Sequence, residues 1–321
     1  MIRTVVGVLR GGTSHEYPLS LKTGAAVLRS LSEDTYDARD ILIDKGGYWY
    51  MRGVPADPVR VLANIDVVFN ALHGGVGEDG SVQRVLDRMH IPYTGSRALP
   101  SRLSLSKIHA KRLFRAAGIP QPRWVTLNMV HGLDTHDVAR TVFNRFGPPY
   151  VVKPPNDGAS FGIRYVPTLL DLSGAIADVL DEYGAAIVEE YLMGDEARVG
   201  TIEKFRGESI YALPPAHVHV EEVCVSSVAH ETGTMRYTTP STFSQETKRE
   251  LEAMAKAAHG ALGLSHLACA DFIVTPHGPK ILEINALPGL YPGAAFPPML
   301  ESVGSSTREM VEHVIALARN Q

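Results

Sequence analysis

The sequence predicts an α/β protein, and three observations lead to that prediction. Residues 4–9 and 66–72 are short apolar runs, as expected for strands that are buried on both faces of a sheet. A glycine-rich turn and then a helical pattern follow each run, an order that is typical of a parallel sheet. Near the C-terminus, residues 270–274 and 280–284 flank the turn 275–279, which predicts a β-hairpin.

The remaining elements follow from the same patterns. Apolar residues at helical spacing predict helices at residues 18–31, 105–117, 169–183, 245–262 and 307–318. Further β-rich runs predict strands at residues 150–153 and 186–192. We therefore expect three units, namely an N-terminal α/β domain at residues 1–100, a central unit at 101–186 and a strand-rich C-terminal unit at 187–321.

The composition narrows the classes of function. The 321 residues carry a net charge of -4 and no block of Lys or Arg, so we expect no nucleic-acid partner. No run approaches the ~18 apolar residues that a membrane-spanning helix needs, so we expect no membrane partner. The two cysteines, Cys224 and Cys269, give no disulfide framework, which fits a cytoplasmic protein.

The predicted hairpin carries several oxygen-bearing side chains. Asp271 lies on its first strand, and Glu283 and Asn285 share one face of the second, because side chains alternate along a strand. Carboxylate and amide oxygens suit Mg²⁺, above all where nucleotide phosphates complete the coordination. The alternative is the solvated face of an edge hairpin, with Asn285 stabilising a turn.

Lysines and glycines in the central unit indicate a phosphate site. Lys153 ends a predicted strand, and a loop with Gly158 and Gly162 follows it, while Lys107 lies on a predicted helix. Glycines let backbone amides approach phosphate oxygens, and a lysine adds positive charge. The alternatives are an ordinary surface loop and a solvent-facing lysine, since the sequence has neither a Walker A loop nor a Rossmann fingerprint.

Acidic residues supply the other candidate positions. Glu189 and Glu196 can bind ribose hydroxyls or an adenine amino group, or can be ordinary strand-end carboxylates. The loops at residues 11–16 and 73–80 follow the predicted parallel strands, where α/β sheets bind ligands. Glu16 in the first loop can anchor a substrate amine or simply begin a helix, and the second loop can be a capping turn.

Taken together, these motifs resemble the D-alanine–D-alanine ligase family over residues 5–299. The matching segments are residues 11–16, 73–80, 91–96, 106–107, 153–162, 189–196 and 283–289. The resemblance implies an ATP-grasp fold of three α/β subdomains, in which ATP lies between the second and the third. It also implies an ATP-dependent ligase that joins two D-alanines through an acyl phosphate, for peptidoglycan precursor synthesis.

The resemblance also assigns roles by position. The implied nucleotide-binding residues are Lys107, Lys153, Gly158, Ser160, Gly162, Glu189, Glu190, Leu192 and Glu196. The implied ligands of Mg²⁺ (or Mn²⁺) are Asp271, Glu283 and Asn285, and the implied catalytic positions are Glu16, Ser160 and Gly289. Glu16 would face a substrate ammonium. The implied partners are D-alanine or another amino acid, and a second copy of the chain in a homodimer.

The chain departs from the family pattern at substrate positions. Cys269 stands where the family has an arginine that contacts a substrate carboxylate, and Ala159 and Ala294 replace two serines. The stretch 218–239, which usually carries a lysine, has none. Candidate replacements are His217, His219, His230 and Arg236. These departures leave two alternatives, an ATP-grasp ligase for another amino acid or amine and a nucleotide-binding homologue with little ligase activity.

Overall fold

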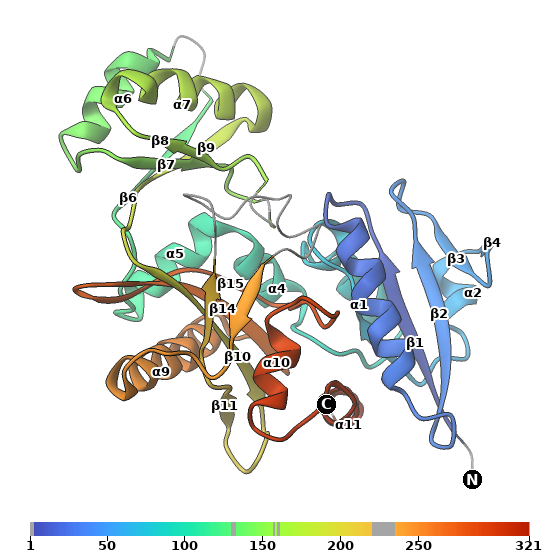
Figure 1. Ribbon diagram of the computed structural model, residues 1–321. Helices are drawn as coiled ribbons and strands as arrows, with labels where there is room; N and C mark the ends of the chain where they lie inside the picture. The colour runs from blue at the N-terminus through green and yellow to red at the C-terminus, as the bar shows by residue number, and fades with distance from the viewer. Residues whose placement is uncertain (1–2, 130–132, 157, 159–160, 220–234, 321) are drawn as a thin grey trace.

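The computed structural model describes residues 3–129, 133–156, 158, 161–219 and 235–320. Its described strands form three sheets with helices packed beside them, so the α/β prediction is confirmed (Figure 1). Within these ranges, no helix combines the length and the apolar character that crossing a membrane requires. The expected domain boundaries, at residues 100 and 186, stay predictions.

The N-terminal sheet contains the expected parallel strands. Its order is β4 (Val54–Pro55), β3 (Trp49–Met51), β2 (Tyr36–Ile43), β1 (Thr4–Gly11) and β5 (Val67–Asn70). β1 is parallel to β2 and β5, whereas β3 and β4 pair antiparallel. The helices of this part are α1 (Tyr17–Ser30), α2 (Pro58–Leu62), the 3-10 turn η1 (Gly75–Gly77) and α3 (Ser81–Arg88). Since β1 and β5 run the same way, the loops that follow them meet at one edge.

The central sheet is antiparallel, and its two helices cover one face (Figure 1). Its strand order is β6 (Trp124–Asn128), β9 (Ala185–Glu190), β7 (Tyr150–Lys153) and β8 (Arg164–Val166). The helices are α6 (Thr135–Phe143) and α7 (Leu169–Tyr183). Val152, Ile176 and Val188 are fully buried between the layers. This apolar core fixes β7 and β9, whose ends carry Lys153 and Glu189.

The C-terminal sheet has the predicted hairpin at its edge. The sheet runs β13 (Arg236–Thr238), β12 (Ala216–His219), β10 (Asp195–Glu203), β14 (Leu267–Thr275) and β15 (Gly278–Asn285), with β11 (Ile210–Ala212) also paired to β10. The helices here are α4 (Ala98–Leu105), α5 (Lys107–Ala116), α9 (Gln245–Leu262), α10 (Phe296–Glu301) and α11 (Thr307–Arg319). Phe114 of α5, Leu251 of α9 and Ile284 of β15 share one buried core. This core therefore fixes the position of the hairpin.

Two local details differ from the expected elements. The helix predicted at residues 105–117 is α5, which begins at Lys107 because Ser106 adopts an extended conformation, and the sequence patterns did not predict the preceding helix α4. Leu192 lies just past the end of β9 rather than within a strand. At the other end of the chain, Val311 of α11 shares a core with Val6 of β1, so the C-terminal helix packs on the N-terminal sheet.

Candidate functional site

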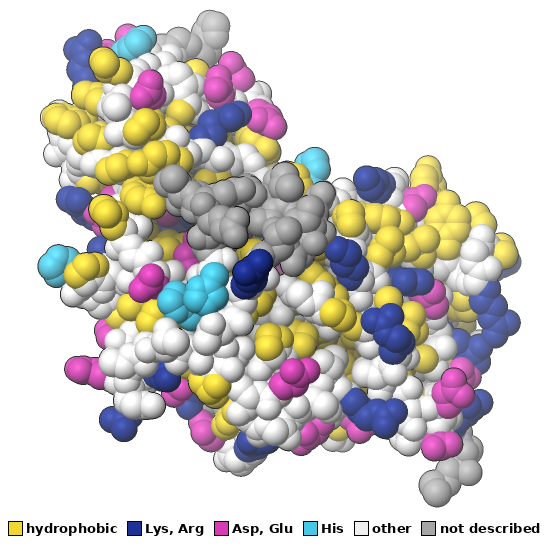
Figure 2. Space-filling model, viewed as in Figure 1, with side chains coloured by type: hydrophobic (Ala, Val, Ile, Leu, Met, Phe, Trp, Pro, Cys, Tyr) yellow, Lys and Arg dark blue, Asp and Glu magenta, His cyan; other side chains and the backbone are white. Residues whose placement is uncertain are grey.

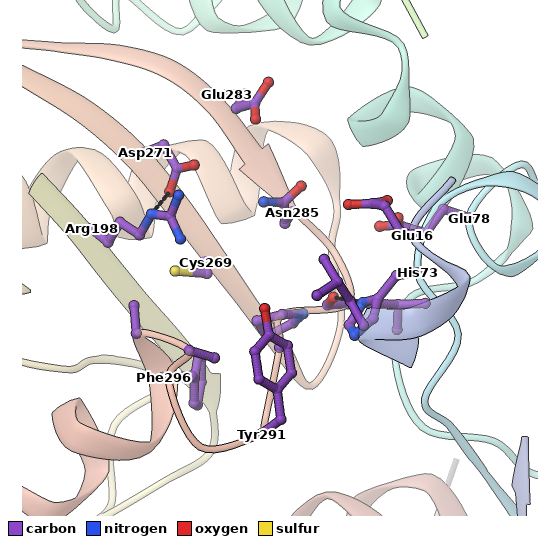
Figure 3. Close-up of a pocket in the computed structure, with 16 residues that line it drawn as sticks. Glu16, His73, Glu78, Arg198, Cys269, Asp271, Glu283, Asn285, Tyr291 and Phe296 are labelled. Carbon is purple, nitrogen blue, oxygen red and sulfur yellow. Dashed lines mark hydrogen bonds and ion pairs between the residues drawn. The ribbon is translucent and has the colours of Figure 1, made fainter. Parts of the chain in front are cut away.

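One pocket lies where the N-terminal loops meet the C-terminal hairpin (Figure 3). Glu16 enters it from the start of α1, and His73 and Glu78 enter from the loop after β5. The predicted site residues that line it are Glu16, Asp271, Glu283, Asn285 and Gly289. Residues that are far apart in the chain therefore face one space.

The hairpin brings the expected metal ligands together. Asp271 pairs with Glu283 across the ladder, and Cys269 pairs with Asn285. Since side chains alternate along each strand, these four residues share one face. The pairing shifts register by a β-bulge after Asp271, a feature that often occurs beside functional sites.

Burial and neighbouring charges act differently on the two carboxyl groups. Burial raises the pKa of Asp271 to about 6, although Arg198 opposes this effect. Burial also disfavours the charged form of Glu283, but Lys107 and Lys153 outweigh it and lower the pKa of Glu283 to about 2. The Nζ atom of Lys107 lies 2.6 Å from the Oε2 atom of Glu283. At neutral pH the hairpin therefore presents negative charge to the pocket.

This donor set fits a magnesium ion that is shared with phosphate groups. It offers two carboxylates and an amide oxygen, all hard ligands, and Asp271 Oδ1 is buried with the ion pair to Arg198 Nε as its described contact. The described residues contain no group of three or more His, Cys, Asp or Glu side chains arranged to hold a metal ion. Phosphate oxygens and water would therefore have to complete the coordination, as Mg²⁺ commonly requires.

Two lysines, the predicted nucleotide-site residue Lys153 and the neighbouring Lys111, contact one buried glutamate. Lys153 Nζ lies 2.9 Å from Glu189 Oε1, and Lys111 Nζ lies 2.8 Å from the same oxygen. Lys107 and Lys111 are both buried, so the solvent-facing alternative for these helix lysines is wrong. Glu189 holds two of the lysines in place, and its contact with adenine stays a prediction.

The other acidic candidates lie on different surfaces. Glu190 follows Glu189 along β9, so its side chain points to the opposite face, where it pairs with Arg123 and Lys280. Glu196 lies near the start of β10, and burial raises its pKa to about 7. The proposed contacts of both residues with the nucleotide stay predictions.

Two glycines lie directly against the carboxylate of Glu16. A methyl group added at Gly158 would lie 2.9 Å from Glu16 Oε2, and one added at Gly74 would lie 2.6 Å from the same atom. Both distances are too short for a carbon atom, so glycine leaves room for the carboxylate at these positions. Phe161 follows Gly158 in the chain and stacks on His15, with ring centroids 4.8 Å apart. The glycine loop of the central unit therefore meets the first N-terminal loop.

His73 connects the N-terminal loops to the segment after β15. Its Nε2 lies 2.7 Å from Thr23 Oγ1, and its Nδ1 lies 2.8 Å from the carbonyl oxygen of Leu287. Burial lowers the pKa of His73 to about 4, so the ring is neutral at pH 7. Because the carbonyl can only accept, Nδ1 donates to it and Nε2 accepts from the Thr23 hydroxyl. These bonds position the segment that carries Gly289.

The pocket wall beyond Gly289 is mostly apolar. Leu19, Tyr291 and Ala294 form a small buried cluster, and a methyl group added at Gly289 would lie 2.8 Å from the Tyr291 ring. Burial raises the pKa of the Tyr291 hydroxyl to about 12. This wall favours small apolar substituents on a bound molecule.

Sequence reasoning did not single out Arg198, which also lines the pocket. Arg198 lies on β10 directly opposite Asp271, and its Nε is 3.2 Å from Asp271 Oδ1 (Figure 3). The sequence did contain a pattern that places Arg198 beside a predicted site residue. Arg198 follows Glu196 by two residues on a strand, so both must share a face.

The candidate replacements for the missing loop lysine do not line this pocket where they are described. His217 stacks on Phe243, with ring centroids 4.8 Å apart, and His219 Nε2 lies 2.7 Å from Thr238 Oγ1. Arg236 is exposed on β13. Four residues of interest lie outside the described ranges, namely Ala159, Ser160, Cys224 and His230.

Comparison with known proteins agrees with this geometry. The family model for the D-ala D-ala ligase C-terminus matches residues 113–316, and the model for the N-terminus matches residues 53–96. The D-alanine–D-alanine ligase of Geobacter sulfurreducens is 34% identical over 317 residues, covering 98% of this chain and 94% of that protein. The corresponding ligase of Geotalea uraniireducens is 33% identical over 316 residues, covering 98% and 95%.

Solved structures show the same fold. The D-alanine-D-alanine ligase from Coxiella burnetii superposes with a TM-score of 0.85 at 24% identity, covering 99% of this chain and 94% of that one. The VanG D-Ala:D-Ser ligase from Enterococcus faecalis gives a TM-score of 0.82 at 24% identity, covering 99% and 100%. Their common architecture is the ATP-grasp fold. With two matching family models and full-length relatives above 30% identity, this chain belongs to the D-alanine–D-alanine ligase family.

Proposed function

We propose that this protein is an ATP- and Mg²⁺-dependent ligase that joins two D-alanine molecules for peptidoglycan precursor synthesis in the cytoplasm. The observation that carries the proposal is a convergence of groups. The oxygen-bearing side chains of the hairpin and of Glu16 line a single pocket, and the buried Lys107 pairs with Glu283 of that lining. The names of the full-length relatives, which are all D-alanine–D-alanine ligases, support the same substrate.

Each group has a role that suits its chemistry. Residues 101–186 and 187–321 would hold ATP between them, and residues 1–100 would bind the first amino acid. Lys107 and Lys153 would neutralise phosphate charge, with the backbone of the glycine loop, including Ser160, close to the phosphates. Mg²⁺, when bound, would neutralise further phosphate charge at the hairpin oxygens. Glu16 would accept hydrogen bonds from the substrate ammonium.

The reaction needs two transfers in one protected site. A carboxylate oxygen of the first D-alanine attacks the terminal phosphorus of ATP, and the bond to ADP breaks to give an acyl phosphate. The amine nitrogen of the second D-alanine attacks the acyl carbon and loses a proton, and phosphate leaves. The protein contributes chiefly by positioning the reactants and by stabilising charge that develops during each transfer.

The direct test measures both products. Purified protein with ATP, Mg²⁺ and D-alanine should release phosphate and form the dipeptide in equal amounts. The variants Asp271→Asn and Glu283→Gln should each lower turnover by at least ~100-fold at a temperature where both are still folded, because each also removes the partner of a largely buried cation and should lower the unfolding midpoint. Glu301→Gln is the matched control, because Glu301 is an exposed acidic residue on α10 and should leave turnover unchanged. Full turnover in both hairpin variants would contradict the proposed site.

A second candidate specificity rests on the altered pocket. Cys269 and Ala294 line the pocket at positions where the family pattern has an arginine and a serine. These replacements favour a ligase that accepts a different second amino acid or amine. A panel of amino acids and amines, followed by phosphate release and mass spectrometry of the product, separates the two. Product from D-alanine alone supports the first proposal, and phosphate release only with another amine supports the second.

We also propose a homodimer, with its interface on the N-terminal unit. Tyr48, Val54 and Val59 are 69%, 64% and 60% exposed, and Figure 2 shows hydrophobic side chains gathered over the β3, β4 and α2 region. Exposed apolar patches of this kind often mark interfaces. Analytical ultracentrifugation should find a dimer that Val54→Asp weakens, and a wild-type monomer at high protein concentration would exclude it.

A further inference from the structure

Arg198 occupies a distinctive place in the pocket. It projects from β10 beside the hairpin, and its side chain is 14% exposed. Its Nε faces Asp271 Oδ1 at 3.2 Å, and its Nη1 donates to the Tyr237 hydroxyl at 3.3 Å. No described residue accepts a hydrogen bond from its Nη2. The guanidinium is therefore held from two sides and keeps one donor group for a ligand.

The charge balance of the pocket makes this donor important. Among the described residues that line the pocket, Arg198 is the only Lys or Arg, whereas four are carboxylic acids, namely Glu16, Glu78, Asp271 and Glu283. Burial keeps His73 neutral near pH 7. A ligand that carries a carboxylate needs a positive partner to enter such a pocket, because like charges in a low-dielectric space repel strongly. Lys107 does not line the pocket and is held in an ion pair with Glu283, so Arg198 is the cation in the described lining that can provide it.

The position of Arg198 relative to Cys269 strengthens this reasoning. Gly200 pairs with Cys269 and Arg198 pairs with Asp271, so Arg198 is the diagonal neighbour of Cys269 on the same face of the sheet. Figure 3 shows the Cys269 sulfur beside the Arg198 side chain. A long side chain from either position can reach the same part of the pocket. A buried neutral thiol at 269 leaves that volume to the guanidinium.

We propose that Arg198 binds the carboxylate of the amino acid substrate, and that it supplies from β10 the positive charge that residue 269 does not supply from β14. This inference rests on the proposed ligase function and names a specificity residue for it. With Nε and Nη1 held by Asp271 and Tyr237, Nη2 can donate a charge-assisted hydrogen bond to a carboxylate, which selects substrates with a free carboxyl group. Glu16, across the pocket, suits the ammonium of such a substrate.

The test compares D-alanine with D-alaninamide, which keeps the ammonium and methyl groups but lacks the carboxylate. Binding is measured by calorimetry in the presence of Mg²⁺ and a non-hydrolysable ATP analogue. Arg198→Ala should weaken D-alanine binding by ~10–100-fold, as expected for the loss of a charge-assisted pair, and should change D-alaninamide binding by less than ~3-fold. Arg198→Lys should fall between wild type and Arg198→Ala. Arg249→Ala is the control, since Arg249 is exposed on α9.

A merely structural role of Arg198 gives a different result. If Arg198 only holds Asp271 in place, both ligands should weaken equally or neither should, and either outcome overturns the inference. ATP-analogue binding and the thermal unfolding midpoint, measured for each variant, identify a folding defect. If Arg198→Ala does not fold, Arg198→Lys decides the question, because the inference requires it to lose D-alanine affinity selectively.

A swapped pair gives an independent check. The double variant Arg198→Ser with Cys269→Arg returns an arginine to the same volume from the neighbouring strand. It should bind D-alanine within ~10-fold of wild type and at least ~5-fold more tightly than Arg198→Ser alone. A folded double variant that binds no better than the single variant overturns the inference. If the wild-type protein forms no dipeptide, the proposed function fails; if it forms dipeptide and Arg198→Ala keeps its preference for D-alanine, only this inference fails.

Discussion

Lys107 and Glu283 form a short ion pair, with Nζ 2.6 Å from Oε2, that joins the first residue of α5 to the second strand of the hairpin. Both side chains are largely buried, so the pair is shielded from water and salt. Burial disfavours the charge on Lys107, but Glu283 outweighs that effect and raises the pKa of the lysine. The pair therefore stays ionised and fixes a positive group beside the expected metal ligands.

Removing the lysine should impair the use of ATP more than the use of the amino acid. In Lys107→Met, Glu283 loses its principal positive neighbour, so its pKa should rise and its affinity for a metal should fall. We expect kcat/KM for ATP to drop by ~10–100-fold, from the loss of about 1.5–3 kcal/mol, with KM for D-alanine nearly unchanged. Phosphate release at varied ATP measures this. Lys256→Met, which breaks an exposed pair with Glu208, should match wild type.

Glu189→Gln should destabilise the protein more than Lys111→Met, because Glu189 is the shared partner of Lys111 and Lys153. Glu189→Gln leaves two buried ammonium groups without their counter-ion, and breaking a buried pair in this way costs about 3–5 kcal/mol. Lys111→Met leaves the pair between Glu189 and Lys153 intact and removes a lysine whose pKa burial lowers to about 8, so it should cost less. Denaturant unfolding of both variants measures the difference, and equal losses would refute a shared role for Glu189.

The arrangement of the hairpin side chains was predictable from the sequence, because it depends only on the alternation of residues along two neighbouring strands and on the short turn between them. Alternation along a strand places Glu283 and Asn285 on one face, and the turn returns the chain to Asp271, so the shared face of these three side chains follows from two short segments. The N-terminal strands were predictable for a similar reason, since continuous apolar runs indicate burial on both faces. In each case the information lies within a few consecutive residues.

The rest of the site depends on long-range contacts that no local pattern contains. A lysine on a helix usually faces solvent, and only the tertiary structure, in which α5 packs on the C-terminal core, places Lys111 Nζ 2.8 Å from Glu189 Oε1. The break between α4 and α5 falls at Ser106, a residue type that is preferred at helix N-caps, but serines also occur at 101 and 104, so the sequence alone does not single out this one. Arg198 lies on a strand of mixed polar and apolar residues, and its partner Asp271 is known only once β10 pairs with β14.

Three buried histidines should contribute less stability as the pH falls below about 6.5, while the raised pKa values of Glu78, Glu196 and Asp271 act in the opposite direction. Burial lowers the pKa of His73, His259 and His266 to about 4 in the folded state, whereas the unfolded state has the ordinary value near 6.5. At these three side chains the unfolded chain therefore binds protons first as the pH falls from about 6.5 towards 4, and their contribution to stability is lost over that window. At pH 5 each histidine should cost about 2 kcal/mol relative to pH 7.5.

Thermal unfolding from pH 7.5 to pH 5 measures this effect. His259→Leu should reduce the pH dependence of the unfolding midpoint, even if it also lowers the midpoint itself, since the His259 Nδ1 contact with Thr201 is lost. The control is His277→Leu, because His277 is exposed and should leave the pH dependence unchanged. A pH profile that is the same in wild type and His259→Leu would contradict this assignment.

A methyl group at Gly158 should impair substrate binding without destabilising the fold. The added carbon would lie 2.9 Å from Glu16 Oε2. The flexible end of the Glu16 side chain can move aside, so the substitution should displace the carboxylate rather than strain the backbone. We expect Gly158→Ala to raise KM for D-alanine roughly fivefold, from about 1 kcal/mol of crowding, with an unchanged unfolding midpoint. Gly174→Ala is the matched control, since Gly174 lies on α7 with open space around it and should gain up to about 1 kcal/mol of stability. An unchanged KM in Gly158→Ala would mean that Glu16 does not hold the substrate ammonium in the position seen here.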